Sequence, residues 1–397
     1  MIIGLVGKPS AGKSSFFKAS TLADVDIANY PFTTLKANSA IGYVNIDCVD
    51  QHFGKQCNPR TGFCKNHKRF IPVQMIDVPG LVPGAHEGHG MGSQFLDELR
   101  QADVLIHVID ISGSTNEKGE AVDALSYDPC NDVAFLESEI DLWYLDILKK
   151  GWEKSVKQMM QCKENTIKYI AKQLSGLGVK EEHVEDSVKQ LNMNIENPQS
   201  WTLEQLLEFA KLLRHKTKPI VIAANKIDIP GSEKNLERLK QKHPDLTIVA
   251  CSAESEIALK SATTAGAIDY VPGETDFKIV KDINNAQKKA LDFIKQNVLD
   301  KFGSTGLQKV LNTVVFDVLK YIAVYPGGVN KLEDQYGNVL PDCFLMPPNS
   351  TALDFAFKIH SDIGNNFIKA IDVKTRKVIG KEHILKTGDV VEICTSK

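Results

Sequence analysis

The strongest constraint on the fold is a glycine-rich turn near the start of the chain. The segment Gly7-Lys-Pro-Ser-Ala-Gly-Lys-Ser14 follows the short apolar run 2–6 and precedes residues 13–20, which favour a helix. In a turn of this spacing between a buried strand and a helix, backbone N–H groups and a helix N-terminus point toward one spot, where phosphate binds. The sequence therefore predicts a phosphate-binding loop in an α/β fold, and a plain glycine turn with an exposed lysine is the alternative.

The residue types in this loop suggest how a nucleotide would be held. Lys13 is expected to reach the β- and γ-phosphates and to act in catalysis, and Ser14 is expected to bind Mg²⁺. The other residues expected at the nucleotide are Gly7, Lys8, Ser10, Ala11, Gly12 and Ser15.

Two further segments predict a magnesium ligand and a sensor of the γ-phosphate. Asp77-Val-Pro-Gly80 follows the strand-like run 70–76, so we expect Asp77 to support Mg²⁺ and the Gly80 N–H to contact the γ-phosphate. Between the two motifs, Asn29-Tyr-Pro-Phe-Thr-Thr34 offers hydroxyls that would complete the metal shell in a switch loop. Thr34 is the predicted ligand and catalytic residue, with Thr33 as the alternative, and an ordinary loop remains an open interpretation.

The glycine-dense stretch 81–92 leaves the positioning of the attacking water open. Leu81 stands where Ras-like enzymes carry the glutamine that orients this water. His86 and His89 are acid–base candidates by their chemistry, but we expect solvated side chains because no orienting partner can be identified from the sequence.

The choice of base is predicted from Asn225-Lys-Ile-Asp228, which follows the apolar run 219–224. The Asp228 carboxylate can accept hydrogen bonds from guanine N1–H and the 2-amino group, whereas adenine offers no donor there. Asn225 is expected to hold N7 and support the loop, and the Lys226 side chain is expected to cover the ring.

A second base-binding segment follows the strand-like run 246–251. We expect the backbone N–H groups of Ser252 and Ala253 to donate to guanine O6, within the motif that ends at Glu254. Adenine would present its amine to the same donors, so the two motifs together favour GTP over ATP.

Composition excludes several other classes of protein. Lys and Arg (47) nearly match Asp and Glu (50), and the formal net charge of −3 gives the whole molecule no attraction to nucleic acid or anionic lipid. The 397 residues contain no apolar run of membrane-spanning length and start without signal-peptide features, so we expect a cytoplasmic protein that does not contact a membrane. We also expect a monomer that does not bind DNA.

The cysteines predict free thiols more readily than a metal site. Cys57 and Cys64 with His67, and His52 upstream, lie in a connection between two strands of the sheet. Their spacing lacks a CxxC pair, so a structured turn with free thiols is the expectation and zinc is the alternative.

Residues 111–218 separate two strand-like runs and are too many for a loop. Apolar residues at helical spacing predict helices within 133–176 and a shorter one over 203–214, and residues 282–300 favour another helix. Seven lysines lie in the first of these regions: Lys149, Lys150, Lys154, Lys157, Lys163, Lys168 and Lys172. They form either a solvated face, which is the commoner case, or a basic surface that binds the phosphates of a nucleic acid.

Together the motifs resemble the Obg-like GTPases, most closely the YchF subfamily in its archaeal form. The resemblance is carried by segments 29–34, 77–85 and 88–96, and by 357–364 and 388–393, which are similar to a TGS domain. It implies an α/β P-loop GTPase domain with a mostly parallel sheet and helices on both faces, a helical insertion and a β-grasp TGS domain. The expected boundaries are 1–112 and 217–315 for the GTPase domain, 113–216 for the insertion and 316–397 for the TGS domain.

The resulting functional hypothesis is a Mg²⁺-dependent GTPase switch, slow without a partner, that binds GTP or GDP and acts with ribosomes or RNA in translation or stress response. The alternatives are an ATPase or a nucleotide-binding scaffold that regulates a protein client. Potassium use stays open, because Ser10 stands where relatives that use K⁺ carry asparagine.

Overall fold

The computed structural model describes most of the chain, namely residues 1–21, 38–78, 98–150, 152–154, 156–157 and 165–396.

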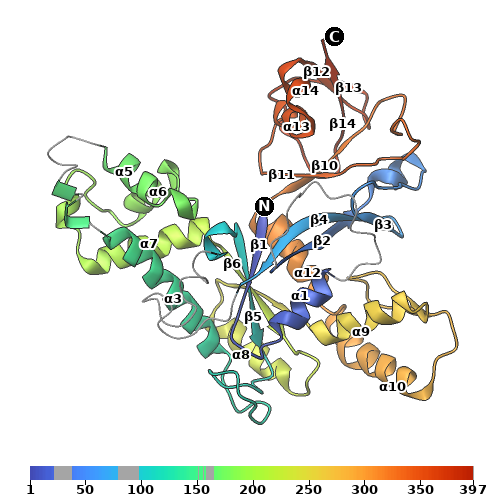
Figure 1. Ribbon diagram of the computed structural model, residues 1–397, viewed down its shortest axis with the longest axis horizontal. Coiled ribbons are helices and arrows are strands. Elements are labelled where there is room, and N and C mark those ends of the chain that lie inside the picture. Colours follow the sequence, from blue (N-terminus) through green and yellow to red (C-terminus); the bar gives the residue numbers. More distant parts are fainter. Residues whose placement is uncertain (22–37, 79–97, 151, 155, 158–164, 397) are drawn as a thin grey trace.

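A mostly parallel sheet occupies the centre of the molecule (Figure 1). Among the described residues it has seven strands in the order β2–β4–β1–β5–β6–β7, with β3 paired to β4. Strands β4, β1, β5, β6 and β7 run parallel, and β2 and β3 run antiparallel to β4. The strands are β1 (Ile2–Val6), β2 (Ser39–Asp47), β3 (Phe63–Lys65), β4 (Lys68–Asp77), β5 (Val104–Asp110), β6 (Ile220–Asn225) and β7 (Thr247–Ala250). The sheet expected from the sequence is thus confirmed.

Helices cover both faces of this sheet, because alternate residues of its buried strands point to opposite sides. On β5, Leu105 and Ile109 join one apolar cluster with α3, α7 and α8, whereas Ile106 and Val108 join another with α1 and α12. The helices of this part of the chain include α1 (Lys13–Thr21), α8 (Ser232–Lys242), α9 (Ala253–Thr264), α10 (Asn285–Ile294) and α12 (Leu307–Asn312). A two-stranded ribbon, β8 (Ile268–Asp269) with β9 (Lys278–Ile279), lies between α9 and α10.

The helix expected over 282–300 is interrupted in its hydrogen-bond pattern. After α10 the chain continues as a π-helical turn, η6 (Lys295–Leu299), and the short α11 (Asp300–Phe302). A second π-helical turn, η7 (Thr313–Val318), extends α12. It spans residue 316, the expected start of the C-terminal domain, and the expected domain boundaries stay a prediction.

The residues between β5 and β6 form a lobe of helices on the left of Figure 1. Its core contains Trp201, whose ring centroid lies 5.5 Å from that of Trp152 and 5.5 Å from that of Phe209. The helices are α3 (Cys130–Lys149), α5 (Thr166–Gln173), α6 (Glu181–Gln190) and α7 (Leu203–Thr217). The sequence analysis did not predict helix α6, which contains only two apolar residues, Val184 and Val188.

A second, smaller sheet forms the C-terminal domain (residues 322–396), at the top of Figure 1. Its strand order is β11–β10–β14–β12–β13, and β10 runs parallel to β14. Helix α13 packs on it through Phe355, and Thr351 caps that helix by accepting from the Asp354 N–H. The elements are β10 (Ile322–Pro326), β11 (Phe344–Met346), α13 (Ala352–Ile359), α14 (Ser361–Asn365), β12 (Phe367–Asp372), β13 (Lys377–Ile379) and β14 (Val390–Thr395).

A buried arginine joins the first and last helices of the helical lobe. Arg214 on α7 is 2% exposed, and its Nε donates to Asp141 Oδ1 at 2.8 Å. Its Nη2 lies 3.3 Å from Glu137 Oε1, on the same helix α3. Removing one partner of a buried ion pair leaves the other charge uncompensated, which is more costly than losing an exposed pair.

We therefore predict that Arg214→Ala lowers the free energy of unfolding by about 3 kcal/mol. The matched control is Lys211→Ala on the same helix, whose exposed pair with Glu208 (2.7 Å) is worth at most about 0.5 kcal/mol. Urea unfolding of the full chain, followed by tryptophan fluorescence, measures both. Equal losses in the two variants would contradict a role for the buried pair.

Candidate nucleotide-binding site

The turn between β1 and α1 has a backbone that needs its glycines. Gly7 and Gly12 have φ values of 156° and 91°. A Cβ at Gly7 would lie 2.4 Å from the Val108 carbonyl oxygen, and one at Gly12 would lie 2.1 Å from Asn225 Nδ2. The turn is thus held against the carboxyl ends of β5 and β6, the edge at which ligands bind in parallel α/β sheets.

Lys13, at the start of α1, is held next to the predicted magnesium ligand on β4. Its Nζ lies 2.6 Å from Asp77 Oδ1 and donates to the Val78 carbonyl oxygen at 2.8 Å. The parallel pairing that sets Leu5 beside Asp77 produces this proximity. The Asp77 carboxylate and the Ser14 hydroxyl are oxygen donors of the kind Mg²⁺ prefers, so the donor set fits that ion.

Lys8 has a partner that the sequence analysis did not anticipate. Its buried Nζ lies 2.9 Å from Asp132 Oδ2 on α3, donates to Thr115 O at 2.8 Å and sits 3.9 Å from the Tyr127 ring centroid. Burial raises the pKa of Asp132 despite the nearby ammonium. The Lys8 side chain thus ties the phosphate loop to the helical lobe, and a contact with phosphate would use its backbone. Asp132 is remote in sequence and belongs to no motif, so no local signal indicates it.

The Asn225 side chain connects the three nucleotide motifs. Its Nδ2 donates to the Ala11 carbonyl oxygen at 3.1 Å, and its Oδ1 accepts from the Ala253 N–H at 3.0 Å. The Ser252 N–H donates to the Thr305 carbonyl oxygen at 2.8 Å. This geometry agrees with the loop-supporting role expected of Asn225. Because an amide nitrogen carries two hydrogens, its bond to Ala11 leaves the second one for guanine N7. The contacts of Asn225 with N7 and of the Ser252 and Ala253 N–H groups with O6 stay predictions.

Lys226 has a carboxylate partner on the neighbouring strand. Its φ is 65°, and its Nζ lies 2.9 Å from Asp110 Oδ2. Burial opposes ionisation of Asp110, but hydrogen bonds from Ser112 and Lys226 outweigh it and hold the pKa below its usual value. The sequence analysis missed Asp110. Its position at the end of a strand-like run is a signal that could have indicated it, and the sheet register places it opposite Asn225.

A cavity of about 600 Å³ joins the phosphate loop to the base-binding loop. Its lining residues come from both, and they are Lys8, Pro9, Ser10, Gly12, Lys13, Ser14, Ser15, Asn225, Lys226, Asp228, Ile229 and Glu254. Four other predicted site residues, Gly7, Ala11, Ser252 and Ala253, are buried and are not among the residues that line it. The remaining predicted site residues, Thr34 and Gly80, and also Leu81, His86 and His89, lie outside the described residues.

Comparison with known proteins identifies the family. A GTP-binding protein of Methanocaldococcus jannaschii is 46% identical over 398 residues, which cover 100% of this chain and 99% of the relative. The chain belongs to the Obg-like/YchF family of GTPases. A GTP-binding protein of Schizosaccharomyces pombe is 35% identical over 89% of this chain and 88% of the relative. A protein named ribosome-binding ATPase YchF, from Buchnera aphidicola, is 25% identical over 98% of this chain and 97% of the relative.

Family models divide the Obg-like chain into three regions. They are described as "50S ribosome-binding GTPase" for residues 2–134, "Obg-like GTPase YGR210-like, G4 motif-containing domain" for 223–328 and "TGS domain" for 336–395. The crystal structure of a GTP-binding protein from Pyrococcus horikoshii matches all of both chains at 39% identity with a TM-score of 0.79. The S. pombe YchF GTPase shares the fold, with a TM-score of 0.61 at 18% identity over 99% of this chain and 97% of that one. Among the described helices, none has the length and apolar character needed to cross a membrane.

The geometry at Gly12 predicts a specific loss of nucleotide binding. A methyl group in Gly12→Ala would meet the Asn225 amide and separate the phosphate loop from the base-binding loop. We expect guanine-nucleotide affinity to fall at least about tenfold, as the loss of about 1.4 kcal/mol would produce.

Gly178→Ala is the matched control for this variant. Gly178 also has a positive φ, 77°, but a Cβ there meets no atom within 4 Å. It should cost about 1 kcal/mol of stability and leave nucleotide affinity unchanged. Binding of a fluorescent guanine nucleotide measures both variants, and equal affinities would contradict the prediction for Gly12.

Proposed function

We propose that this protein is a Mg²⁺-dependent GTPase switch that acts on ribosomes. The observation that carries the proposal is a single cavity lined both by Lys13 and Ser14 of the phosphate loop and by Asp228 of the base-binding loop. A site with phosphate donors and a base acceptor in one cavity suits a nucleoside triphosphate. Membership of the Obg-like/YchF family supports the same ligand class.

Different residues of the described part of the chain would bind the phosphates and the Mg²⁺ ion. The Lys13 ammonium and the helix N-terminus at α1 would compensate the charge of the β- and γ-phosphates. Ser14 and Asp77 would hold Mg²⁺, which supplies further compensation of the phosphate charge when bound. The short contact between Lys13 and Asp77 keeps both groups together at the end of the site where the metal and phosphates would meet.

Hydrolysis in this proposal is slow without a partner. The residue after Gly80 is Leu81, so the side chain that orients water in Ras-like enzymes is replaced by an apolar one. Thr34 and the Gly80 N–H remain the proposed contacts to metal and γ-phosphate. A partner that supplies a polar group would raise the rate, as GTPase-activating proteins do.

Guanine selectivity in this proposal rests on Asp228. Adenine offers no donor to the Asp228 carboxylate, and an unpaired buried acceptor costs free energy. The competing function is an ATPase that regulates a protein client, and it is favoured by the name of the Buchnera relative. The complete Asn225-Lys-Ile-Asp228 sequence favours GTP.

We predict that Asp228→Asn lowers the preference for GTP over ATP by roughly two orders of magnitude. Competition of unlabelled GTP and ATP against a fluorescent guanine nucleotide gives the ratio of affinities. Asp245→Asn, an exposed aspartate just before β7, is the control and should keep the wild-type ratio. An unchanged ratio in the Asp228 variant would refute the assignment, and a wild-type preference for ATP would favour the competing function.

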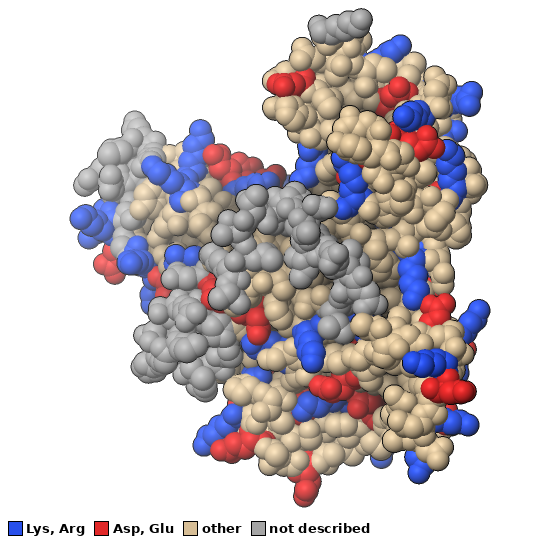
Figure 2. Space-filling view, turned by 45° about the vertical axis from the view of Figure 1, so that its right-hand side comes forward, with Lys and Arg blue, Asp and Glu red and all other residues tan. Residues whose placement is uncertain are grey.

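Ribosome binding is proposed from the family and from the surface of the helical lobe. The family model over residues 2–134 and the Buchnera relative both have "ribosome-binding" in their descriptions. Acidic and basic side chains are interspersed on the face in Figure 2, so RNA contact needs a local group of lysines. The helical lobe offers exposed lysines for this contact, namely Lys149, Lys150, Lys154, Lys157, Lys168 and Lys172.

Co-sedimentation of the full chain with ribosomes from its own source tests this proposal. We expect binding with a non-hydrolysable GTP analogue and at least about tenfold weaker binding with GDP. Replacing Lys150, Lys168 and Lys172 by Ala should weaken binding similarly, because phosphate contacts are lost. The control replaces the exposed Lys281, Lys288 and Lys289, remote from the lobe in sequence. Absence of binding with either nucleotide would refute the ribosomal role and leave the GTPase assignment intact.

A further inference from the structure

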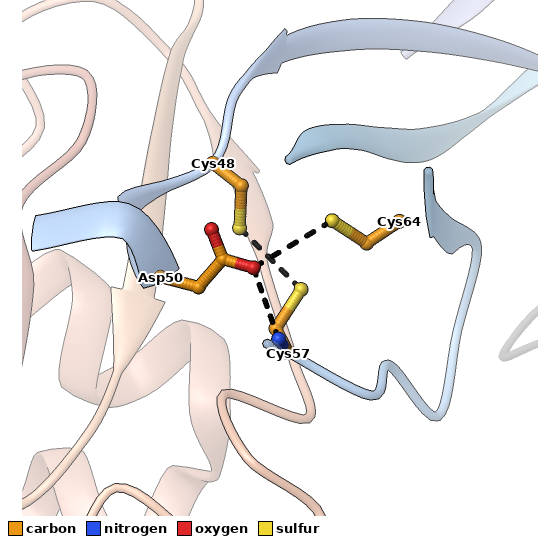
Figure 3. A group of neighbouring side chains, drawn as sticks. All are labelled: Cys48, Asp50, Cys57 and Cys64. Atoms are coloured by element: carbon orange, nitrogen blue, oxygen red, sulfur yellow. Dashed lines mark hydrogen bonds between the residues drawn. The ribbon is translucent and has the colours of Figure 1, made fainter. Parts of the chain in front are cut away.

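A second cluster of reactive side chains lies in the connection between β2 and β4, and it shares no residue with the nucleotide cavity. Here η2 (Val49–Phe53), a loop and β3 bring together side chains that are up to 16 positions apart in sequence (Figure 3). The members are Cys48, Asp50, Cys57 and Cys64. Their side chains point toward one common centre.

The spacing of these side chains is close to that in the coordination shell of one small ion. The Sγ atoms of Cys48 and Cys57 are 3.4 Å apart, and Cys64 Sγ is 3.9 Å from Asp50 Oδ2. One ligand atom from each of the four residues lies within 4.8 Å of every other. A tetrahedral ion with Zn–S bonds of about 2.3 Å and a Zn–O bond of about 2.1 Å separates its ligand atoms by roughly 3.5–3.8 Å.

We propose that Cys48, Cys57, Cys64 and Asp50 form a structural zinc site. Three sulfur ligands select against Mg²⁺ and Ca²⁺, which take oxygen ligands, and favour a softer ion. Four protein ligands complete a tetrahedron and leave no position for a substrate, which is the arrangement of structural rather than catalytic zinc. The proposal replaces the sequence-based expectation of a turn with free thiols.

The proposed ligands have the supporting hydrogen bonds that zinc sites use. Asp50 is fully buried, and its Oδ1 lies 2.9 Å from His67 Nδ1. Its Oδ2 accepts from the Cys57 N–H at 2.9 Å. The His67 carbonyl oxygen accepts from the Cys48 N–H at 2.7 Å, so His67 positions two ligands without binding the ion itself. His52 instead packs edge-on against Phe53.

A buried arginine beside the cluster supports its negative charge. Arg69 is fully buried, and its guanidinium donates to the carbonyl oxygens of Leu340 and Pro341 and lies 3.7 Å from Cys57 Sγ. Within the described part of the chain, its buried Nε has no hydrogen-bond partner, and the hydrogen bonds of its two Nη atoms go to carbonyl oxygens and a sulfur instead of a carboxylate. A buried cation needs a counter-charge. Three thiolates and a carboxylate around a divalent ion retain net negative charge and would provide it.

The cluster closes a loop that docks on the C-terminal domain. Within residues 54–62, the Asn58 N–H donates to Val339 O at 3.1 Å and the Arg60 N–H donates to Pro341 O at 2.9 Å. Lys55 and Glu333 form an ion pair at 2.5 Å, and Arg60 pairs with Asp342. Zinc would therefore fix the shape of the loop that joins the nucleotide-binding domain to the C-terminal domain.

Zinc content of the full chain, purified without a histidine tag from zinc-supplemented medium, tests the site. We expect about one zinc per chain in the wild type and at most about a tenth of that in Cys57→Ser and Cys64→Ser. Cys394→Ser is the matched control, because Cys394 is half-buried like Cys64 but lies on β14. Elemental analysis by plasma mass spectrometry gives the ratio, and guanine-nucleotide binding shows that each variant is folded.

Two measurements on the wild type keep the test valid if a variant does not fold. Titration of the thiols with an organomercurial should release zinc, detected with a chromophoric chelator. Substitution with Co²⁺ should give thiolate-to-cobalt charge-transfer absorption and the visible bands of a tetrahedral ion. A wild-type chain that binds guanine nucleotide but no zinc, or that carries a Cys48–Cys57 disulfide instead, would overturn the proposal.

The positioning role of His67 and the docking role of the site have separate readouts. His67→Ala should lower zinc affinity roughly 10- to 100-fold, measured by competition with a chelator, while the stoichiometry at saturating zinc stays the same. Chelation of the wild type should speed tryptic cleavage after Lys55 and Arg60 roughly tenfold as the loop opens locally. Equal cleavage with and without zinc would overturn the role in domain docking.

Discussion

The amide of Asn225 is the interaction on which the nucleotide site depends. With one donor and one acceptor it connects the phosphate loop at Ala11 to the segment after β7 at Ala253. Gly12 has to lack a side chain because the amide occupies the space where a Cβ would be. The amide thereby connects loops that follow three different strands of a parallel sheet.

Two ion pairs place charges around this connection. Lys13 with Asp77 gathers a cation and a carboxylate where metal and phosphate would bind, and Lys226 with Asp110 anchors the base-binding loop to β5. A third pair, Lys8 with Asp132, links the phosphate loop to the first helix of the helical lobe. That lobe is stiffened in turn by Arg214, which connects α7 to α3. Both pairs involve α3, so this helix connects the phosphate loop to the last helix of the lobe.

On the opposite side of the sheet, apolar contacts and hydrogen bonds to the backbone connect it to the C-terminal domain. Apolar side chains of the first sheet and of β10 and β14 form one cluster, and Arg69 reaches across to the backbone at Leu340 and Pro341. The loop closed by the cysteines adds the remaining contacts. A zinc ion there would order the chain locally where only short elements are available to hold it.

The sequence by itself determined the features that depend on local backbone geometry or on strand patterning. Glycine spacing and a strand–turn–helix order identify the phosphate loop, and unbroken apolar runs identify β5 and β6, because each depends on neighbouring residues. The family and the fold class follow from those motifs. Helix α6, with few buried apolar residues, carries too weak a pattern to be identified.

Only the tertiary structure decided which distant groups meet. Lys8 and Arg69 contact partners from elements far away in the chain. The same holds for the acceptors of the Ser252 and Ala253 N–H groups. Cys48, Cys57 and Cys64 have no local motif, and they converge because η2 and β3 fold back against β4. Convergence of this kind is set by sheet register and loop path, which residue spacing alone does not encode.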